Sequence, residues 1–261
     1  MSTSHGAGRR RRRRVRIGHA AIDDVTMVEA VDAIVDLVAR QQGGFICTPN
    51  VDHVVLLEDD ARLRGAYERA SLVLADGAPI LWASRLLGAP LREKVSGSDL
   101  MEPLLLRAAE ERWRVYLAGG GEGVAERAAA RLKTEAPGLE IVGIDARRID
   151  LDSEGLDPLV AGIVAARPDL VLVALGCPKQ EIVMDRIARL VRPAVCAGIG
   201  AGLDFVAGTV SRAPRWISAA GLEWLYRLAR EPRRLWRRYL VRDPRFVAIV
   251  GREMVGRRLE G

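Results

Sequence analysis

The stretch LVLADGAP, residues 72–79, places a carboxylate at the end of a strand-like run of apolar residues. Four apolar residues lead into Asp76, and Gly77 and Pro79 then predict a turn. Similar apolar runs at 45–48, 115–118, 140–144, 170–175 and 194–197 alternate with helical patterns at about 53–70, 98–112, 122–135, 156–166 and 179–190. A capping box at Thr26 and Glu29 predicts a further helix. Strands that are apolar on both faces and alternate with helices indicate an α/β fold, a parallel Rossmann-like sheet flanked by helices on both faces.

The residues that follow these runs are candidates for a binding site. In such a sheet, ligands bind beyond the carboxyl ends of the strands. The candidates at this edge are Thr48 and Asn50 after the first run, Asp76 after the second, Gly119 and Gly120 after the third, Gln180 after the run at 170–175, and Gly200 and Asp204 after the last. We therefore expect Asp76 to lie in a cleft with polar neighbours.

The formal net charge of +6 conceals a division along the chain. Residues 1–16 carry seven arginines and no acidic residue, and residues 221–261 carry eleven arginines against five acidic residues. Between them, residues 17–220 carry 22 basic and 29 acidic residues. We predict a disordered arginine-rich extension over 1–16, an α/β domain over 17–220 and a C-terminal helical basic appendage over 221–261.

The overall composition narrows the class of protein. Apolar residues make up 49% and charged residues 28%, which is typical of a soluble globular protein. The cysteines Cys47, Cys177 and Cys196 are far apart, which argues against a disulfide framework or a zinc site. No apolar run has the length of a membrane span, and no apolar signal-peptide core stands near the start. These features favour a cytoplasmic location.

The segment GLEWLYRLAREPRRLWRRYL, residues 221–240, interleaves leucine, tryptophan and tyrosine with arginine. The pattern predicts a helical hairpin with its break at Pro232. Arginine forks bind phosphate, and aromatic rings beside arginine suit the boundary between water and lipid. We therefore favour contact with an anionic membrane surface over a solvated helix face or a nucleic-acid patch.

Each candidate site also has a simpler interpretation. Asp76 is either catalytic or a turn former, since aspartate before glycine is common in turns. The glycines in AGGGEG, residues 118–123, either present amides to a phosphate or form a tight turn. DLD, residues 150–152, matches a metal-binding D-x-D pattern, but its place before a helix favours capping. His53 has no obvious partner, and no other cluster has metal-ligand spacing.

Several motifs together resemble one known family. The segments are TPNVDHV (48–54), ADGAPILWASRLLG (75–88), KVSGSDL (94–100), YLAGGGEGVAERAA (116–129), PDLVLVALGCPKQE (168–181), CAGIGAGLDFVAGTVSRAP (196–214) and GLEWLYRLAREPRRLWRRYL (221–240). Taken in this order, they resemble the WecG/TagA/CpsF glycosyltransferases, known as glycosyltransferase family 26. The likeness extends from about residue 17 to residue 250.

The resemblance implies an inverting transfer, without a metal cofactor, from a UDP-sugar to a polyprenyl-diphosphate-linked sugar. It implies N-acetylmannosamine as the best-known donor sugar, and wall polymer or exopolysaccharide synthesis at the inner face of the plasma membrane as the setting. Asp76 matches the proposed general base, Thr48 and Asn50 match residues near the acceptor, and Gln180 matches the glutamine of PKQE. Lys94 replaces a usual arginine, so a bidentate grip on the diphosphate is not available there. The C-terminal arginines, among them Arg227, Arg234 and Arg237, match an appendage that completes the active site and meets membrane phosphates.

The residues alone leave other functions open. UDP-glucose or a UDP-uronic acid could be the donor, because sequence does not place the pocket contacts. A non-catalytic nucleotide- or nucleic-acid-binding module is a different class, although we do not expect nucleic acid as the partner. Self-association into a homo-oligomer also stays open.

Overall fold

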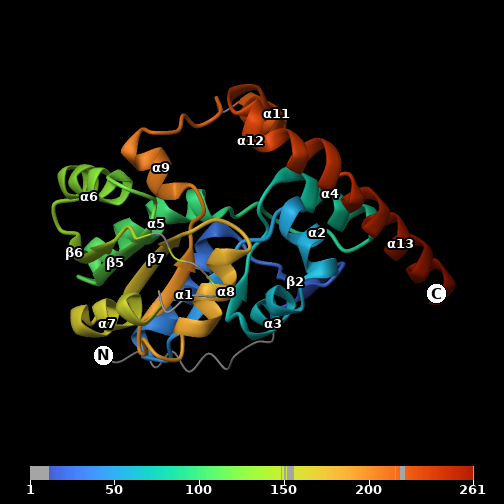
Figure 1. Cartoon of the computed structure of the whole chain (residues 1–261). Helices are drawn as coiled ribbons and strands as arrows, with labels where there is room; N and C mark the ends of the chain where they lie inside the picture. The colour runs from blue at the N-terminus through green and yellow to red at the C-terminus, as the bar shows by residue number, and fades with distance from the viewer. Residues whose placement is uncertain are drawn as a thin grey trace.

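A parallel sheet of six strands forms the centre of the computed structural model (Figure 1). The structure describes residues 12–147, 149, 151, 156–214, 216–217 and 221–260. The strand order is β4-β3-β8-β7-β5-β6, and every neighbouring pair is parallel. The strands are β3 (Gly44–Cys47), β4 (Leu72–Val73), β5 (Arg114–Gly119), β6 (Glu140–Asp145), β7 (Leu170–Ala174) and β8 (Val195–Gly198). The sequence-based fold class and the places of these six strands are confirmed.

Side chains along the strands alternate between two separate hydrophobic clusters. On β7, Val171 and Val173 belong to one cluster, whereas Leu170 and Leu172 belong to the other. Because successive strand residues point to opposite faces, both faces of this strand are buried. This double burial is the reason that the strands read as uninterrupted apolar runs.

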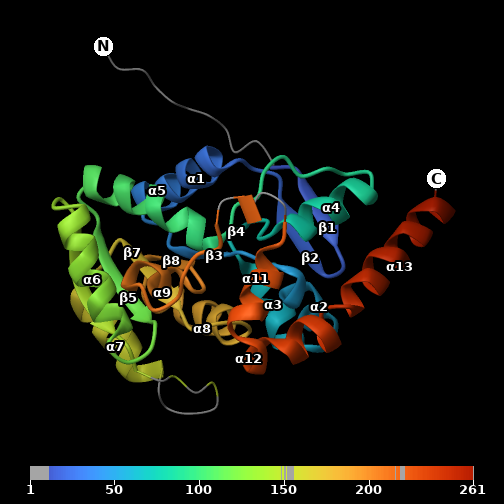
Figure 2. The same ribbon diagram turned by 90° about the horizontal axis from the view of Figure 1, so that it is seen from above.

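Helices cover both faces of the sheet (Figures 1 and 2). The first cluster includes residues of α2 (Val51–Asp59), α3 (Ala61–Arg69), α4 (Ala78–Leu86), α7 (Leu156–Ala166), α8 (Lys179–Ile187) and α13 (Arg245–Glu260). The second includes residues of α1 (Met27–Ala39), α5 (Gly97–Glu110), α6 (Val124–Glu135) and α9 (Gly202–Ala207). The capping box of α1 is confirmed, because the Thr26 hydroxyl accepts from the Glu29 backbone and the Glu29 carboxylate accepts from the Thr26 backbone.

Two boundaries differ from the sequence-based expectation. The helical pattern at 53–70 divides at Asp60, whose carboxylate accepts the backbone N–H groups of Arg62 and Leu63 and so starts α3. The arginine-rich extension does not reach residue 16, because β1 (Arg14–Ile17) pairs with β2 (Ala20–Asp23) in an antiparallel hairpin. Residues 1–11 of the extension lie outside the described residues.

The C-terminal segment runs across the carboxyl edge of the sheet and then away from it (Figure 2). It comprises α11 (Glu223–Arg230), α12 (Pro232–Trp236), the π-helical turn η1 (Arg237–Arg242) and α13. The break at Pro232 is confirmed, since this proline occupies the first turn of α12. The Trp224 ring packs edge-on against Tyr239 at a centroid distance of 6.0 Å, which joins α11 to η1.

Ion pairs fasten this segment to the body of the protein. The buried carboxylate of Asp52, on α2, lies 3.2 Å from Arg238 Nε and 2.5 Å from an Arg242 guanidinium nitrogen. Burial of Phe246 and Ile249 against the first cluster adds apolar contact. Because a carboxylate buried this deeply needs paired charge, the two arginines and Asp52 stabilise one another only when the segment is docked.

Gly119, at the end of β5, is a position where packing permits no side chain. Its φ is +94°, and an added Cβ would stand 2.3 Å from the Ala174 carbonyl oxygen. We expect Gly119→Ala to lower the free energy of unfolding by about 3 kcal/mol, because both strain and overlap oppose it. Urea unfolding checks this. Gly251→Ala, in open space on α13, is the matched control and should leave stability equal or slightly higher.

Candidate active site

The loops beyond the carboxyl ends of the strands enclose a cavity of about 850 Å³. Its floor is formed by residues after β3, β4, β5, β7 and β8, and its roof is formed by the C-terminal segment. Among the sequence-predicted site residues, the lining includes Thr48, Asn50, Asp76, Lys94, Gly120, Gln180, Gly200, Asp204, Arg227 and Arg234. The convergence of these residues at one sheet edge is what the strand pattern predicts.

Asp76 stands where β4 gives way to a turn. Its backbone N–H donates to the Pro49 carbonyl at 3.0 Å, and Val95 donates to the Ala75 carbonyl at 2.8 Å, so neighbouring loops hold the position. Burial in the cavity wall, together with the nearby charge of Glu223, raises the pKa of Asp76 from 3.8 to about 6, while His53 and Lys94 oppose the shift. A carboxylate with this pKa is ionised near neutral pH and is a stronger base than an exposed aspartate.

Asn50 and Thr48 lie on the loop between β3 and α2. Asn50 is the N-cap of α2, and its side-chain oxygen accepts from the backbone N–H of Asp52 at 3.1 Å and of His53 at 3.4 Å. Thr48 is buried. Its hydroxyl lies close to Gly97, because a Cβ added to that glycine would stand 3.1 Å from Thr48 Oγ1. The TPN motif therefore serves the start of a helix as well as the cavity.

Lys94 belongs to a small charge network on the rim of the cavity. Its ammonium nitrogen lies 2.8 Å from Asp99 Oδ2, and an Arg212 guanidinium nitrogen lies 2.9 Å from Asp99 Oδ1. Burial lowers the pKa of Lys94, but pairing with Asp99 outweighs it and raises the pKa overall. Lys94 therefore stays cationic in the cavity, with its charge partly compensated by Asp99.

The glycine loop after β5 leaves room in the cavity but offers it few free backbone N–H groups. Gly120 lines the cavity, but its N–H donates to the Ala174 carbonyl at 2.9 Å and is not free for a phosphate. Gly119 lies outside the lining, since β7 packs against it. The Gly200 N–H is likewise occupied, because it donates to Gln180 Oε1 at 3.1 Å.

Gln180 and Asp204 have partners within the protein. Gln180 is buried, its oxygen accepts from Gly200 and its nitrogen donates to Glu181 Oε1 at 2.9 Å. The amide oxygen therefore ties α8 to the loop after β8, while the amide nitrogen is used within α8. The Asp204 carboxylate accepts from the Thr209 hydroxyl at 3.1 Å on the far wall of the cavity.

Arginines of the C-terminal segment form the cationic part of the roof. Arg227 and Arg234 line the cavity, as does Arg238, whereas Arg237 is exposed and its guanidinium stacks on Trp236 at 5.4 Å. The lining therefore gives no support to the prediction that Arg237 reaches the site, whereas its neighbour Arg238 does line the cavity.

Sequence reasoning missed four residues of this site: His53, Glu181, Glu223 and Arg238. His53 was expected to lack a partner, but its Nε2 lies 3.4 Å from Glu181 Oε1. A signal for His53 exists, because it lies three residues after the N-cap Asn50, at the position that a capping box uses. Nothing in the local pattern marks Glu181, which is separated from His53 by more than a hundred residues.

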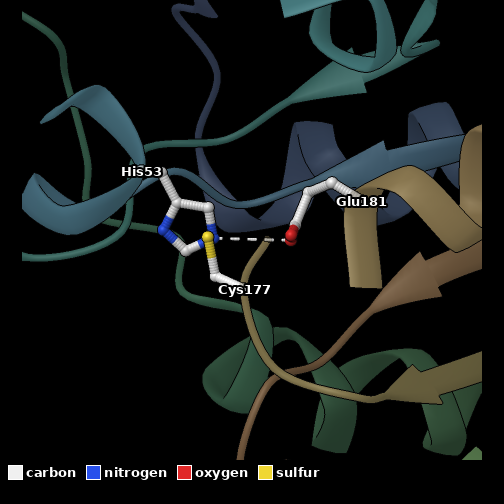
Figure 3. A group of neighbouring side chains, drawn as sticks. All are labelled: His53, Cys177 and Glu181. Atoms are coloured by element: carbon white, nitrogen blue, oxygen red, sulfur yellow. Dashed lines mark ion pairs between the residues drawn. The ribbon is translucent and has the colours of Figure 1, made fainter. Parts of the chain in front are cut away.

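His53, Cys177 and Glu181 come together from α2, from the loop after β7 and from α8 (Figure 3). Their ligand atoms lie within 4.8 Å of one another, so sequence spacing alone missed this group. The set does not fit a metal well, because burial holds the pKa of the Cys177 thiol well above its ordinary value and metals bind the thiolate. His53 Nε2 and Glu181 already face each other as an ion pair. The two aspartates of the D-x-D pattern, Asp150 and Asp152, lie outside the described residues.

The fold and the cavity define a class of protein: an α/β enzyme whose site pairs a basic carboxylate with arginines suited to a phosphate-bearing substrate. The sequence model of the Glycosyl transferase WecG/TagA/CpsF family matches residues 15–260, so the chain belongs to this family. It is a glycosyltransferase and not a non-catalytic binding module, and the resemblance found in the motifs is confirmed.

Two relatives carry the name N-acetylglucosaminyldiphosphoundecaprenol N-acetyl-beta-D-mannosaminyltransferase. The protein of Bacillus spizizenii strain W23 is 34% identical over 211 residues, which cover 81% of this chain and 80% of the relative. The protein of Bacillus subtilis strain 168 is 31% identical over 198 residues, which cover 76% of this chain and 75% of the relative. Separately, none of the described helices combines the length and apolar character that crossing a bilayer requires.

The raised pKa of Asp76 has a consequence for stability. Because the folded pKa of about 6 exceeds the ordinary value of 3.8, this group's contribution to stability is complete below the ordinary value and is lost as the pH rises through about 6. We expect Asp76→Asn to raise the free energy of unfolding by about 2 kcal/mol more at about pH 8 than at about pH 4. Urea unfolding at both pH values measures it. A pH-independent difference, equal to that of Asp32→Asn on the exposed face of α1, would contradict the assignment.

Proposed function

We propose that this chain transfers an N-acetylmannosamine-type sugar from UDP to a polyprenyl-diphosphate-linked N-acetylglucosamine, with inversion at the anomeric carbon. The observation that carries the proposal is Asp76, a carboxylate with a pKa of about 6 in a cavity roofed by arginines. The names of the two Bacillus relatives support the choice of sugar and acceptor. Cell-wall polymer or exopolysaccharide synthesis is the setting in which such an acceptor is used.

Asp76 is the general base in this proposal. As the acceptor hydroxyl oxygen forms a bond to the anomeric carbon, Asp76 takes the hydroxyl proton. On the opposite side of the sugar, the bond between the anomeric carbon and the UDP oxygen breaks, and UDP leaves with the electron pair.

The departing diphosphate requires positive charge. Arg227, Arg234 and Arg238 line the roof, and Lys94 lies on the rim. Arginine remains charged throughout the reaction and forms forked hydrogen bonds with phosphate oxygens. We propose that these side chains supply the electrostatic stabilisation that a divalent cation supplies in other transferases, so that the reaction needs no metal cofactor.

The C-terminal segment also suits an anionic membrane surface. Trp216, Trp236, Leu240 and Val241 are exposed large apolar residues in or beside it. Arg230, Arg233 and Arg237 on the same segment are exposed and are not part of the cavity lining. Aromatic anchors and arginines together favour peripheral binding, and we propose the inner face of the plasma membrane as the site of action. Self-association through this face would compete with membrane contact.

Replacing the proposed base tests the mechanism. We expect Asp76→Asn to lower kcat by about 10³-fold with little change in KM, because the base acts in the transition state. In the unmodified enzyme, kcat/KM should fall as the pH drops through about 6. The assay follows transfer from a panel of UDP-sugars to a short-chain polyprenyl-diphosphate-GlcNAc by mass spectrometry, which also identifies the donor. Turnover within about 2-fold of the unmodified enzyme would rule out Asp76 as the base.

Membrane contact can be tested without disturbing the cavity. The triple change Arg230→Gln, Arg233→Gln and Arg237→Gln should weaken binding to phosphatidylglycerol vesicles by about 100-fold, since each cation contributes about 1 kcal/mol. The matched control replaces Arg167, Arg189 and Arg192 with glutamine in the same way. These residues lie near the amino ends of β7 and β8, at the edge of the sheet opposite the cavity. Vesicle sedimentation measures both. Equal loss in the two triple variants would indicate that only net charge matters.

A further inference from the structure

A fully buried carboxylate lies just beneath the floor of the cavity. Glu181, on α8, is 0% exposed. Its Oε1 accepts from Gln180 Nε2 at 2.9 Å and lies 3.4 Å from His53 Nε2, while its Oε2 has no hydrogen-bond partner among the described residues. Burial alone would raise the pKa of Glu181, but the His53 ring lowers it below its ordinary value. Since burying an ionised carboxylate costs several kcal/mol, Glu181 depends on its contacts with the His53 ring and Gln180.

His53 is held from both sides of its ring. Nε2 faces the Glu181 carboxylate, and Nδ1 lies 2.8 Å from the side-chain oxygen of Asn50 (Figure 3 shows the Glu181 side). Both neighbours present an oxygen to the ring, so the two contacts together hold it in one orientation. The Asn50 backbone nitrogen is farther from Nδ1, at 3.4 Å, and does not set the ring's hydrogen bonding.

The orientation of the Asn50 amide follows from its neighbours. Its Oδ1 accepts from the backbone N–H of Asp52 and from Arg238 Nη2 at 3.2 Å, in addition to His53 Nδ1. Turning the amide around would place its NH₂ group against these donors, so the hydrogen-bond network assigns one orientation. Nδ2 donates to no other described residue, and Asn50 lines the cavity. The NH₂ group is therefore the end that a ligand can reach.

We propose that Glu181 and His53 are positioning residues that hold the Asn50 side chain with its NH₂ group turned toward the substrate. Glu181 orients the His53 ring, and His53 fixes Asn50 Oδ1. The same oxygen accepts a hydrogen bond from Arg238, so the relay formed by Glu181, His53 and Asn50 also contacts the roof of the cavity. This inference rests on the proposed function only in assigning the Asn50 amide to a substrate oxygen, because the orientation itself is a property of the unliganded protein.

The sequence offers a direct observation of this amide, because Asn50 is its single asparagine. Protein labelled with ¹⁵N-asparagine should give one pair of side-chain NH₂ resonances. We expect Glu181→Gln and His53→Phe to shift or broaden this pair, since the acceptor Oδ1 loses its fixed donor. His19→Phe, which removes an exposed histidine on the β1–β2 turn, should leave it unchanged. An unchanged pair in both Glu181→Gln and His53→Phe overturns the proposal whatever the substrate is.

Kinetics then tests whether the relay acts through Asn50. We expect His53→Phe and Asn50→Ala each to lower kcat/KM by about 10- to 100-fold, and the double variant to be no worse than Asn50→Ala alone. Losses that multiply would assign His53 a separate role and overturn the relay. Glu181→Gln keeps the side-chain volume and gives the same comparison if His53→Phe fails to fold. Absence of transfer by the unmodified enzyme would count against the proposed substrates, and the resonance experiment would still decide the relay.

Discussion

The ion pairs of Asp52 with Arg238 and Arg242 determine whether this protein has an active site at all. The body supplies a floor of loops, but the cavity is closed only where the C-terminal segment crosses it. The Asp52 carboxylate is buried, so it needs the paired charge of the docked arginines. One contact between α2 and η1 thus connects the start of the TPN helix, the arginine roof and the space in which Asp76 lies.

The site places acidic side chains near one another and balances them with cationic ones. Asp76 and Glu223 are both acidic, and burial raises the pKa of the first, yet Lys94 and His53 limit the shift. The balance leaves a base that is ionised near neutral pH without being fully neutralised by a partner. Most cationic side chains of the cavity, Arg227, Arg234 and Arg238, lie on the C-terminal segment instead.

The strand pattern predicted most of the fold because double burial leaves a direct record in sequence. A run such as 170–175 cannot be apolar on every residue unless both faces are covered, and polar residues at its end mark the loop edge. The hairpin β1–β2 was missed because its strands are short and begin within an arginine-rich stretch. Asp76, Thr48 and Asn50 were found by position, whereas Glu181 was hidden within a helix and Arg238 stands among neighbouring arginines that no local pattern distinguishes.

The π-helical turn has a consequence for how the chain can vary. It holds one residue more than an α-helical turn would, and Asp243 closes it by donating to the Arg238 carbonyl. A substitution in η1 alters one side chain, but a one-residue deletion would turn α13 about its axis by roughly 100° relative to α11. Phe246 and Ile249 would then leave the first hydrophobic cluster, and the roof would come loose. Chain length in this turn is therefore under tighter physical control than the identity of most of its residues.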